Sequence, residues 1–103
     1  MDQTFIIMAL RELQFTQEGD VWVAEETVSN DYSLHLERKK GGYFHISQRS
    51  SDTGVFVPCA LPPWLERTGQ FIDHSFGHGV YPMHIRIVSE TEVTMGTIRE
   101  AES

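Results

Sequence analysis

Short runs of alternating apolar and polar residues, each ended by turn-forming residues, are the feature of this sequence that most limits its possible folds. The clearest run is residues 32–38, where every second side chain is apolar: Tyr32, Leu34 and Leu36. Residues 43–49 repeat the pattern with Phe44 and Ile46. Successive side chains of an extended strand point to opposite faces, so a period of two residues gathers the apolar side chains on one face. The sequence therefore predicts β-strands with one buried and one exposed face.

About eight such runs fit into the chain, and its 103 residues are the size of one domain. We therefore expect a single β domain over residues 1–103, an all-β fold built as a small antiparallel β-sandwich. A small β-barrel or jelly roll is the alternative, because it is built from strands of the same kind. One short helical turn is expected at residues 63–68, where Pro63 can begin it and Gly69 can end it.

The runs 32–38 and 43–49 are expected to form a β-hairpin, because only a short glycine-containing turn separates them. The apolar side chains of both strands share one face only if His35, Glu37 and His45 lie together on the other face. The sequence thus predicts two imidazoles and a carboxylate side by side on the surface of one sheet.

A second hairpin is expected from residues 80–88 and 93–99, which four polar residues separate. Its first strand has an apolar face made of Tyr81, Met83, Ile85 and Ile87. Across the turn, Val93 and Met95 are expected to complete that face. Both strands should then lie next to each other in one sheet.

The first residues allow more than one interpretation. Apolar side chains in residues 5–15 occur at strand spacing and also at helical spacing, and we favour a strand from Arg11 to Thr16 because β-rich sequence follows. Residues 1–7 are left open as a strand, a helix or a loose leader. The apolar stretch 5–10 is too short to cross a membrane, and no basic segment precedes it as in a secretion signal. We expect a cytoplasmic or virion location and no membrane partner.

The charge of the chain argues against a nucleic-acid partner. Fifteen Asp and Glu outnumber eight Lys and Arg, giving a net charge of −7. Nucleic-acid-binding proteins neutralise phosphates with clustered cations, and the basic cluster Arg38-Lys39-Lys40 is only three residues long. The single cysteine, Cys59, cannot form an intrachain disulfide or a cysteine zinc site, so we expect a buried thiol. We expect no cofactor.

Five histidines raise the question of a metal site: His35, His45, His74, His78 and His84. The spacing of His74 and His78 suits a metal only on a helix, and Gly77 between them argues against one. A cupin-like site instead gathers histidines from several strands of a β-barrel, and His35, His45 and His84 are the candidate ligands. Solvated histidines on polar faces and in turns are the interpretation we prefer.

Aromatic residues in the connections are the candidate contact residues. A tryptophan that follows two prolines, as Trp64 does, can anchor a binding surface or close the open end of a sandwich. We predict a contact surface made of Trp64, Leu65, Phe76, His78 and Tyr81. A carbohydrate platform would need several exposed rings, but the alternation places Tyr32 on the apolar face and leaves Tyr43 alone on the polar one.

No catalytic motif accompanies these residues: the sequence has neither a G-x-S-x-G elbow nor a phosphate-binding loop followed by a helix. We therefore expect a non-enzymatic structural or protein-interaction module that binds other protein subunits, copies of itself or different chains. A subunit of a larger assembly such as a virus particle would suit a small β-sandwich, by analogy at the level of the fold. The alternative is a cupin-like β-barrel that binds a metal or small ligand. Three histidines that converge on one point would favour this barrel over the interaction module.

Overall fold

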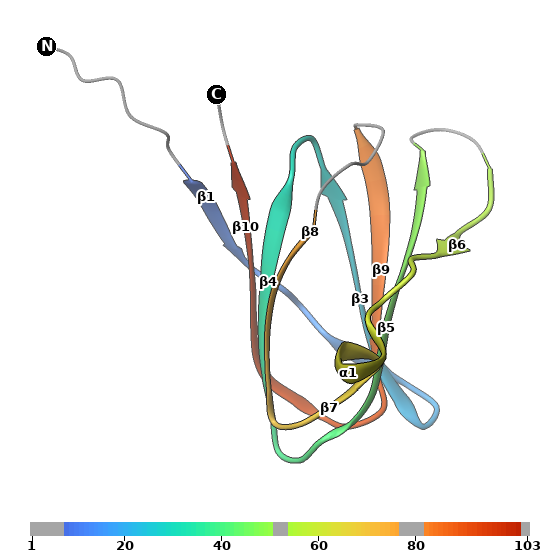
Figure 1. Ribbon diagram of the computed structural model, residues 1–103, viewed down its shortest axis with the longest axis vertical. Coiled ribbons are helices and arrows are strands. Elements are labelled where there is room, and N and C mark those ends of the chain that lie inside the picture. The colour runs from blue at the N-terminus through green and yellow to red at the C-terminus, as the bar shows by residue number, and fades with distance from the viewer. Residues whose placement is uncertain (1–7, 51–53, 77–81, 102–103) are drawn as a thin grey trace, which may run out of the picture.

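Two antiparallel β-sheets packed face to face make up the protein. The computed structural model describes residues 8–50, 54–76 and 82–101 (Figure 1). Sheet A contains, in spatial order, β1 (Met8–Glu12), β10 (Val93–Ala101), β4 (Tyr32–Arg38) and β8 (Phe71–Phe76). Sheet B contains β2 (Thr16–Glu18), β3 (Val21–Val28), β9 (Met83–Ser89), β5 (Gly42–Ser50) and β6 (Val57–Pro58). The expected all-β sandwich is confirmed.

The order of the strands is that of a jelly roll, the arrangement expected as the alternative. The chain changes sheet six times, between β1 and β2, β3 and β4, β4 and β5, β7 and β8, β8 and β9, and β9 and β10. As a result β1-β10-β4-β8 lies over β3-β9-β5-β6, and strands far apart in sequence become neighbours. Met8 of β1, for example, lies opposite Ala101 of β10.

Neither of the two expected hairpins forms. β4 pairs with β10 and β8 in sheet A, whereas β5 pairs with β9 in sheet B. His35 and Glu37 therefore lie on the outer face of sheet A and His45 on the outer face of sheet B, so the prediction that the three lie together is wrong. Alternation identifies the buried face of a strand but not its neighbour, because strands on both sides of the core turn their apolar faces inward.

The second hairpin fails in the same way, since β9 lies in sheet B and β10 in sheet A. Val93 packs against the core as expected, but Met95 is exposed. The register of β10 against β4 shifts between these two residues, from Val93 opposite Arg38 to Met95 opposite Glu37. A bulge of this kind reverses the alternation, which moves Met95 to the outer face.

The space between the sheets is filled by apolar side chains. Ten of them, from both sheets and from the connection before β8, are at most 1% exposed: Val28, Leu34, Leu36, Phe44, Ile46, Leu65, Ile72, Ile85, Ile87 and Ile98. Burial of one such side chain contributes about 1.5–3 kcal/mol. The alternation correctly identified most of these residues, because it requires knowledge of only the face of each strand.

The expected helical turn is α1 (Pro63–Glu66). Pro63 occupies its first turn, and the backbone N–H groups of Leu65 and Glu66 donate to the carbonyl of Pro62 at 2.8 and 3.1 Å. The helix ends earlier than residue 68, because the two-residue strand β7 (Arg67–Thr68) follows at once and pairs with β5. Leu65 fixes α1 to the core.

Some predictions fall on parts of the chain outside the described residues: the contact residues His78 and Tyr81, and the conformation of residues 1–7. Among the described residues, none of the helical structure is long and apolar enough for a membrane span.

Candidate functional site

The outer face of sheet A combines exposed apolar side chains with charged ones. The register of its four strands places their outward side chains in three rows across the sheet. The rows are Leu10-Arg99-Ser33-Ser75, Glu12-Thr97-His35-Asp73 and Met95-Glu37-Phe71. Leu10, Met95 and Phe71 are exposed, and Phe71 is 64% exposed. These three side chains lie on different strands, and polar side chains such as Glu37 lie between them.

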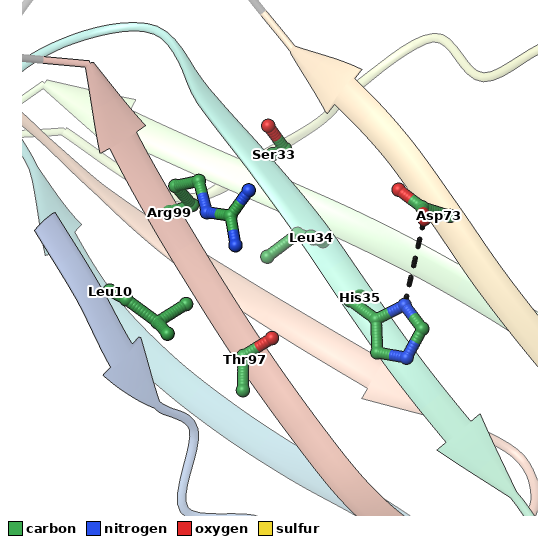
Figure 2. Close-up of a pocket in the computed structure, with 7 residues that line it drawn as sticks. All are labelled: Leu10, Ser33, Leu34, His35, Asp73, Thr97 and Arg99. Carbon is green, nitrogen blue, oxygen red and sulfur yellow. Dashed lines mark ion pairs between the residues drawn. The ribbon is translucent and has the colours of Figure 1, made fainter. Parts of the chain in front are cut away.

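A hollow of about 270 Å³ lies in this face (Figure 2). It is lined by Leu10, Ser33, Leu34, His35, Asp73, Thr97 and Arg99, which come from all four strands of sheet A. The guanidinium of Arg99 turns toward β4 over the floor of the hollow. No acidic side chain of the described residues forms an ion pair with Arg99. Within the described parts of the chain, the hollow thus offers a cation without an acidic partner, beside hydroxyl groups and an apolar wall.

His35 links two carboxylates across neighbouring strands. Its Nε2 lies 2.9 Å from Oε2 of Glu37, and its Nδ1 lies 3.6 Å from Oδ2 of Asp73 on β8. The hydrogen bond to Glu37 raises the pKa of His35, with smaller contributions from the charges of Asp73 and Glu37, and these outweigh the lowering by burial. The protonated ring can donate to Glu37 and form an ion pair with Asp73, which ties β4 to β8.

This arrangement does not suit His35 to general-base catalysis. Each of its ring nitrogens faces a carboxylate, so neither is free to take a proton from a neighbouring hydroxyl group. The nearby hydroxyls of Ser33 and Ser75 lie 3.4 Å from each other, at the outer limit of a hydrogen bond.

The predicted contact residues Trp64 and Phe76 come together beside the edge strand β8. Trp64 is 63% exposed as a residue, and its ring meets His74 edge-on at 5.7 Å between ring centroids. His74 in turn meets Phe76 edge-on at 4.9 Å. Leu65 lies in the core and positions α1 without forming part of the surface. The structure therefore places an exposed aromatic side chain on the rim of sheet A.

The three candidate metal ligands do not converge. His35 lies on sheet A, while His45 and His84 lie on the outer face of sheet B. Within sheet B, His84 is opposite Arg49 and His45 is opposite Val88, so the two imidazoles are separated by about 13 Å along the strands. The described residues contain no group of three or more His, Cys, Asp or Glu side chains that could hold a metal ion.

Several residues of this surface were not identified as candidates from the sequence: Leu10, Phe71, Asp73, Met95, Thr97 and Arg99. Their grouping depends on the order β1-β10-β4-β8, which joins strands from opposite ends of the chain. Alternation could have marked Asp73 and Arg99 as outward-facing. The bulge in β10 hides Met95, because a regular strand would have placed it in the core.

Comparisons with known proteins give no further assignment: no family model, curated protein or solved structure matches the chain.

Proposed function

We propose that this protein is a non-enzymatic structural or interaction module that binds other protein subunits through the outer face of sheet A. The observation that carries the proposal is the position of the apolar and charged side chains and of the hollow. Fully buried apolar side chains fill the space between the sheets, and the hollow lies on the outer face of sheet A. The buried charged residues Arg38 and Glu100 form hydrogen bonds with other groups of the protein. A jelly roll that binds a small ligand inside needs interior room and inward polar groups.

The composition of the face supports a protein partner. Leu10, Met95 and Phe71 are large exposed apolar residues, and Arg99, Asp73 and Glu12 add charges of both signs. Protein interfaces combine apolar contacts with a polar rim that determines partner choice. The same combination on one sheet face provides both area and selectivity.

The jelly roll also supports a place in a larger assembly. Capsid shells and lectins use this arrangement of strands, and a virus-particle subunit is the assembly role that we propose for the chain. This step is an analogy at the level of the fold, so it depends on direct measurement of assembly.

Two measurements test the proposal. Native mass spectrometry of the full chain should give a mass without metal or small ligand; one metal ion per chain, lost in His35→Ala, would contradict the proposal.

In the second measurement, immobilised protein should bind partner chains from its source at fixed stoichiometry. The double variant Phe71→Glu with Met95→Glu should weaken that binding at least tenfold, since buried apolar anchors contribute about 2 kcal/mol or more.

Val55→Glu is the matched control, because it makes the same change at an exposed apolar residue outside sheet A. It should bind partner chains as the wild type does. Equal loss of partner binding in Val55→Glu and in the double variant would mean that sheet A is not the contact surface.

A further inference from the structure

The strand β8 presents a free hydrogen-bonding edge. It pairs only with β4, so one of its two sides has no neighbouring strand among the described residues. The backbone N–H of Arg38 donates to the carbonyl of Gln70, which identifies these two residues as a hydrogen-bonded pair. In an antiparallel ladder such pairs recur at every second residue, so Ile72, His74 and Phe76 bond to β4. The N–H and C=O groups of the alternate residues point away from it: Phe71, Asp73 and Ser75.

Of the described strands at the ends of the two sheets, β8 is the longest, and it carries an acidic side chain and has aromatic neighbours. Asp73, in its middle, has a side chain that is 79% exposed. Phe71 lies two residues before Asp73 on the same face of β8. Trp64 packs against His74, whose side chain is on the opposite face of the strand. Unpaired edges bind added strands through main-chain hydrogen bonds, while side chains at alternate positions select the sequence.

A second copy of the chain fits this edge poorly. If two β8 strands pair about a two-fold axis centred on Asp73, the two carboxylates lie directly opposite each other. Shifting the register by two residues keeps them diagonal neighbours. Each copy also carries a net charge of −7, which adds repulsion between copies. These charges favour a partner of opposite sign.

We propose that the free edge of β8 binds an extended segment of a different protein by strand addition, with a Lys or Arg of that segment beside Asp73 and an apolar residue beside Phe71. The proposal rests on the proposed function and specifies the partner's chemistry. The cation and the apolar residue are two positions apart, because Phe71 and Asp73 are. The residue between the two lies on the other face of the added strand.

The probe is a blocked peptide of seven residues, threonine-valine-threonine-lysine-threonine-valine-threonine. Its sequence is the same in both directions, so its lysine can lie beside Asp73 and a valine beside Phe71 whichever way the strand runs. Amide hydrogen exchange of the full chain should slow at Phe71, Asp73 and Ser75 when the peptide binds. The amides of Ile72 and His74 should not change, since they already donate to β4.

Charge is tested by a twin peptide with glutamate in place of lysine. It should bind about fivefold more weakly, which is the effect of one cross-strand charge pair. Asp73→Lys should reverse the preference. Equal binding of both peptides by wild type and Asp73→Lys would overturn the charge assignment.

Strand addition itself is tested by Ser75→Pro. Proline on the free side of an edge strand is compatible with the fold, but it removes an outward N–H and obstructs an added strand. This variant should lose peptide binding. Ser33→Ala is the matched control, because it removes the same 3.4 Å contact between Ser75 and Ser33 and leaves the edge intact.

Three results would overturn the proposal: peptide binding retained by Ser75→Pro, slowed exchange elsewhere than β8, or a dimer that Ser75→Pro dissociates. If Ser75→Pro does not fold, the reversal by Asp73→Lys decides. Partner binding that needs Phe71 and Met95 but survives Ser75→Pro would refute edge addition and leave the proposed function standing. A bound metal would instead refute the proposed function.

Discussion

Arg38 places a guanidinium inside one end of the sandwich, where only 4% of the residue is exposed. Its two terminal nitrogens donate to five acceptors, so that one N–H group is shared. Four of the acceptors are main-chain carbonyls: those of Gly42 and Tyr43 at the start of β5, of Thr68 in β7 and of Gly69 after it. Burial lowers the pKa of Arg38, and the charge of Glu90 opposes that change. Because an arginine stays charged even so, its hydrogen bonds must balance the cost of burial.

We predict that Arg38→Ala lowers the free energy of unfolding by about 3 kcal/mol, since it leaves several buried carbonyls without donors. The free energy of unfolding of Arg38→Lys should lie between those of Arg38→Ala and the wild type, because one ammonium cannot reach all of these acceptors. Urea unfolding measures the change. Lys39→Ala is the control: its exposed pair with Glu92 is worth less than about 0.5 kcal/mol. A loss in Arg38→Ala no larger than in Lys39→Ala would contradict this role.

Glu100 joins β10 to the connection between β3 and β4. Its Oε1 accepts hydrogen bonds from the N–H groups of Ser29 and Asn30 at 2.6 and 3.2 Å, and its Oε2 accepts one from Arg11 at 2.6 Å. Burial alone raises the pKa of Glu100, but the hydrogen bonds from Ser29, Arg11 and Asn30 outweigh it, so the pKa lies below its usual value.

A lowered pKa in the folded state means that the carboxylate stabilises the fold fully above the pKa of the unfolded chain, about 4.3, and ceases to do so as the pH falls through the lower folded value. We predict that Glu100→Gln costs about 2 kcal/mol at pH 6 and that the difference from wild type shrinks toward pH 2.5. Urea unfolding at both pH values tests this, with Glu92→Gln as the exposed control. A difference that does not depend on pH would be the contrary result.

The crossing from β4 to β5 shows why elements were easier to predict than their partners. The runs 32–38 and 43–49 were both correctly expected as strands, and their buried faces were correct. The turn between them looked like a hairpin in sequence, but it carries the chain from sheet A to sheet B. What decides the outcome is packing at a distance: Gly41 lies so close to the Thr68 and Gly69 backbone that a Cβ would sit 2.6 Å from the Thr68 carbonyl oxygen.

We predict that Gly41→Ala lowers the free energy of unfolding by about 2 kcal/mol, because backbone atoms on both sides must move apart. Gly69→Ala is a matched control, since a Cβ there meets nothing within 4 Å. It should change stability by less than about 0.5 kcal/mol. Thermal unfolding of both variants measures the difference. Equal stability of the two would show that the crossing can relax without cost.

The same limit explains which parts of the candidate site were predictable. The position of Trp64 between strands was predictable, because prolines and turn residues are local signals; it lies in α1, and its role in binding stays a prediction. The grouping of residues on the outer face of sheet A could not be predicted. Leu10 and Arg99 come close to His35 and Asp73 only because of the strand order. Alternation in one run contains no information about a strand sixty residues away.

At the scale of the molecule, the jelly roll makes long-range pairing the main source of structure. β1 pairs with β10, β4 with β8 and β10, and β3 with β9, so almost every ladder joins segments distant in sequence. Among the described residues, the only pairings of consecutive strands are β2 with β3 and β5 with β6, and both are short. Loop-closure entropy must therefore be overcome before most core contacts form.

We predict that folding from urea takes milliseconds to seconds at 25 °C, as for other β-folds with non-local pairing. Stopped-flow fluorescence of Trp22 and Trp64 measures this folding rate.

Removing core contacts between distant strands, as in Ile98→Val on β10, should lower the free energy of unfolding by about 1 kcal/mol. Shortening the β2–β3 turn around Gly19 should leave the folding rate nearly unchanged, because that hairpin closes locally. Folding within microseconds, or control by the β2–β3 turn, would mean that local structure rather than sandwich closure limits the rate.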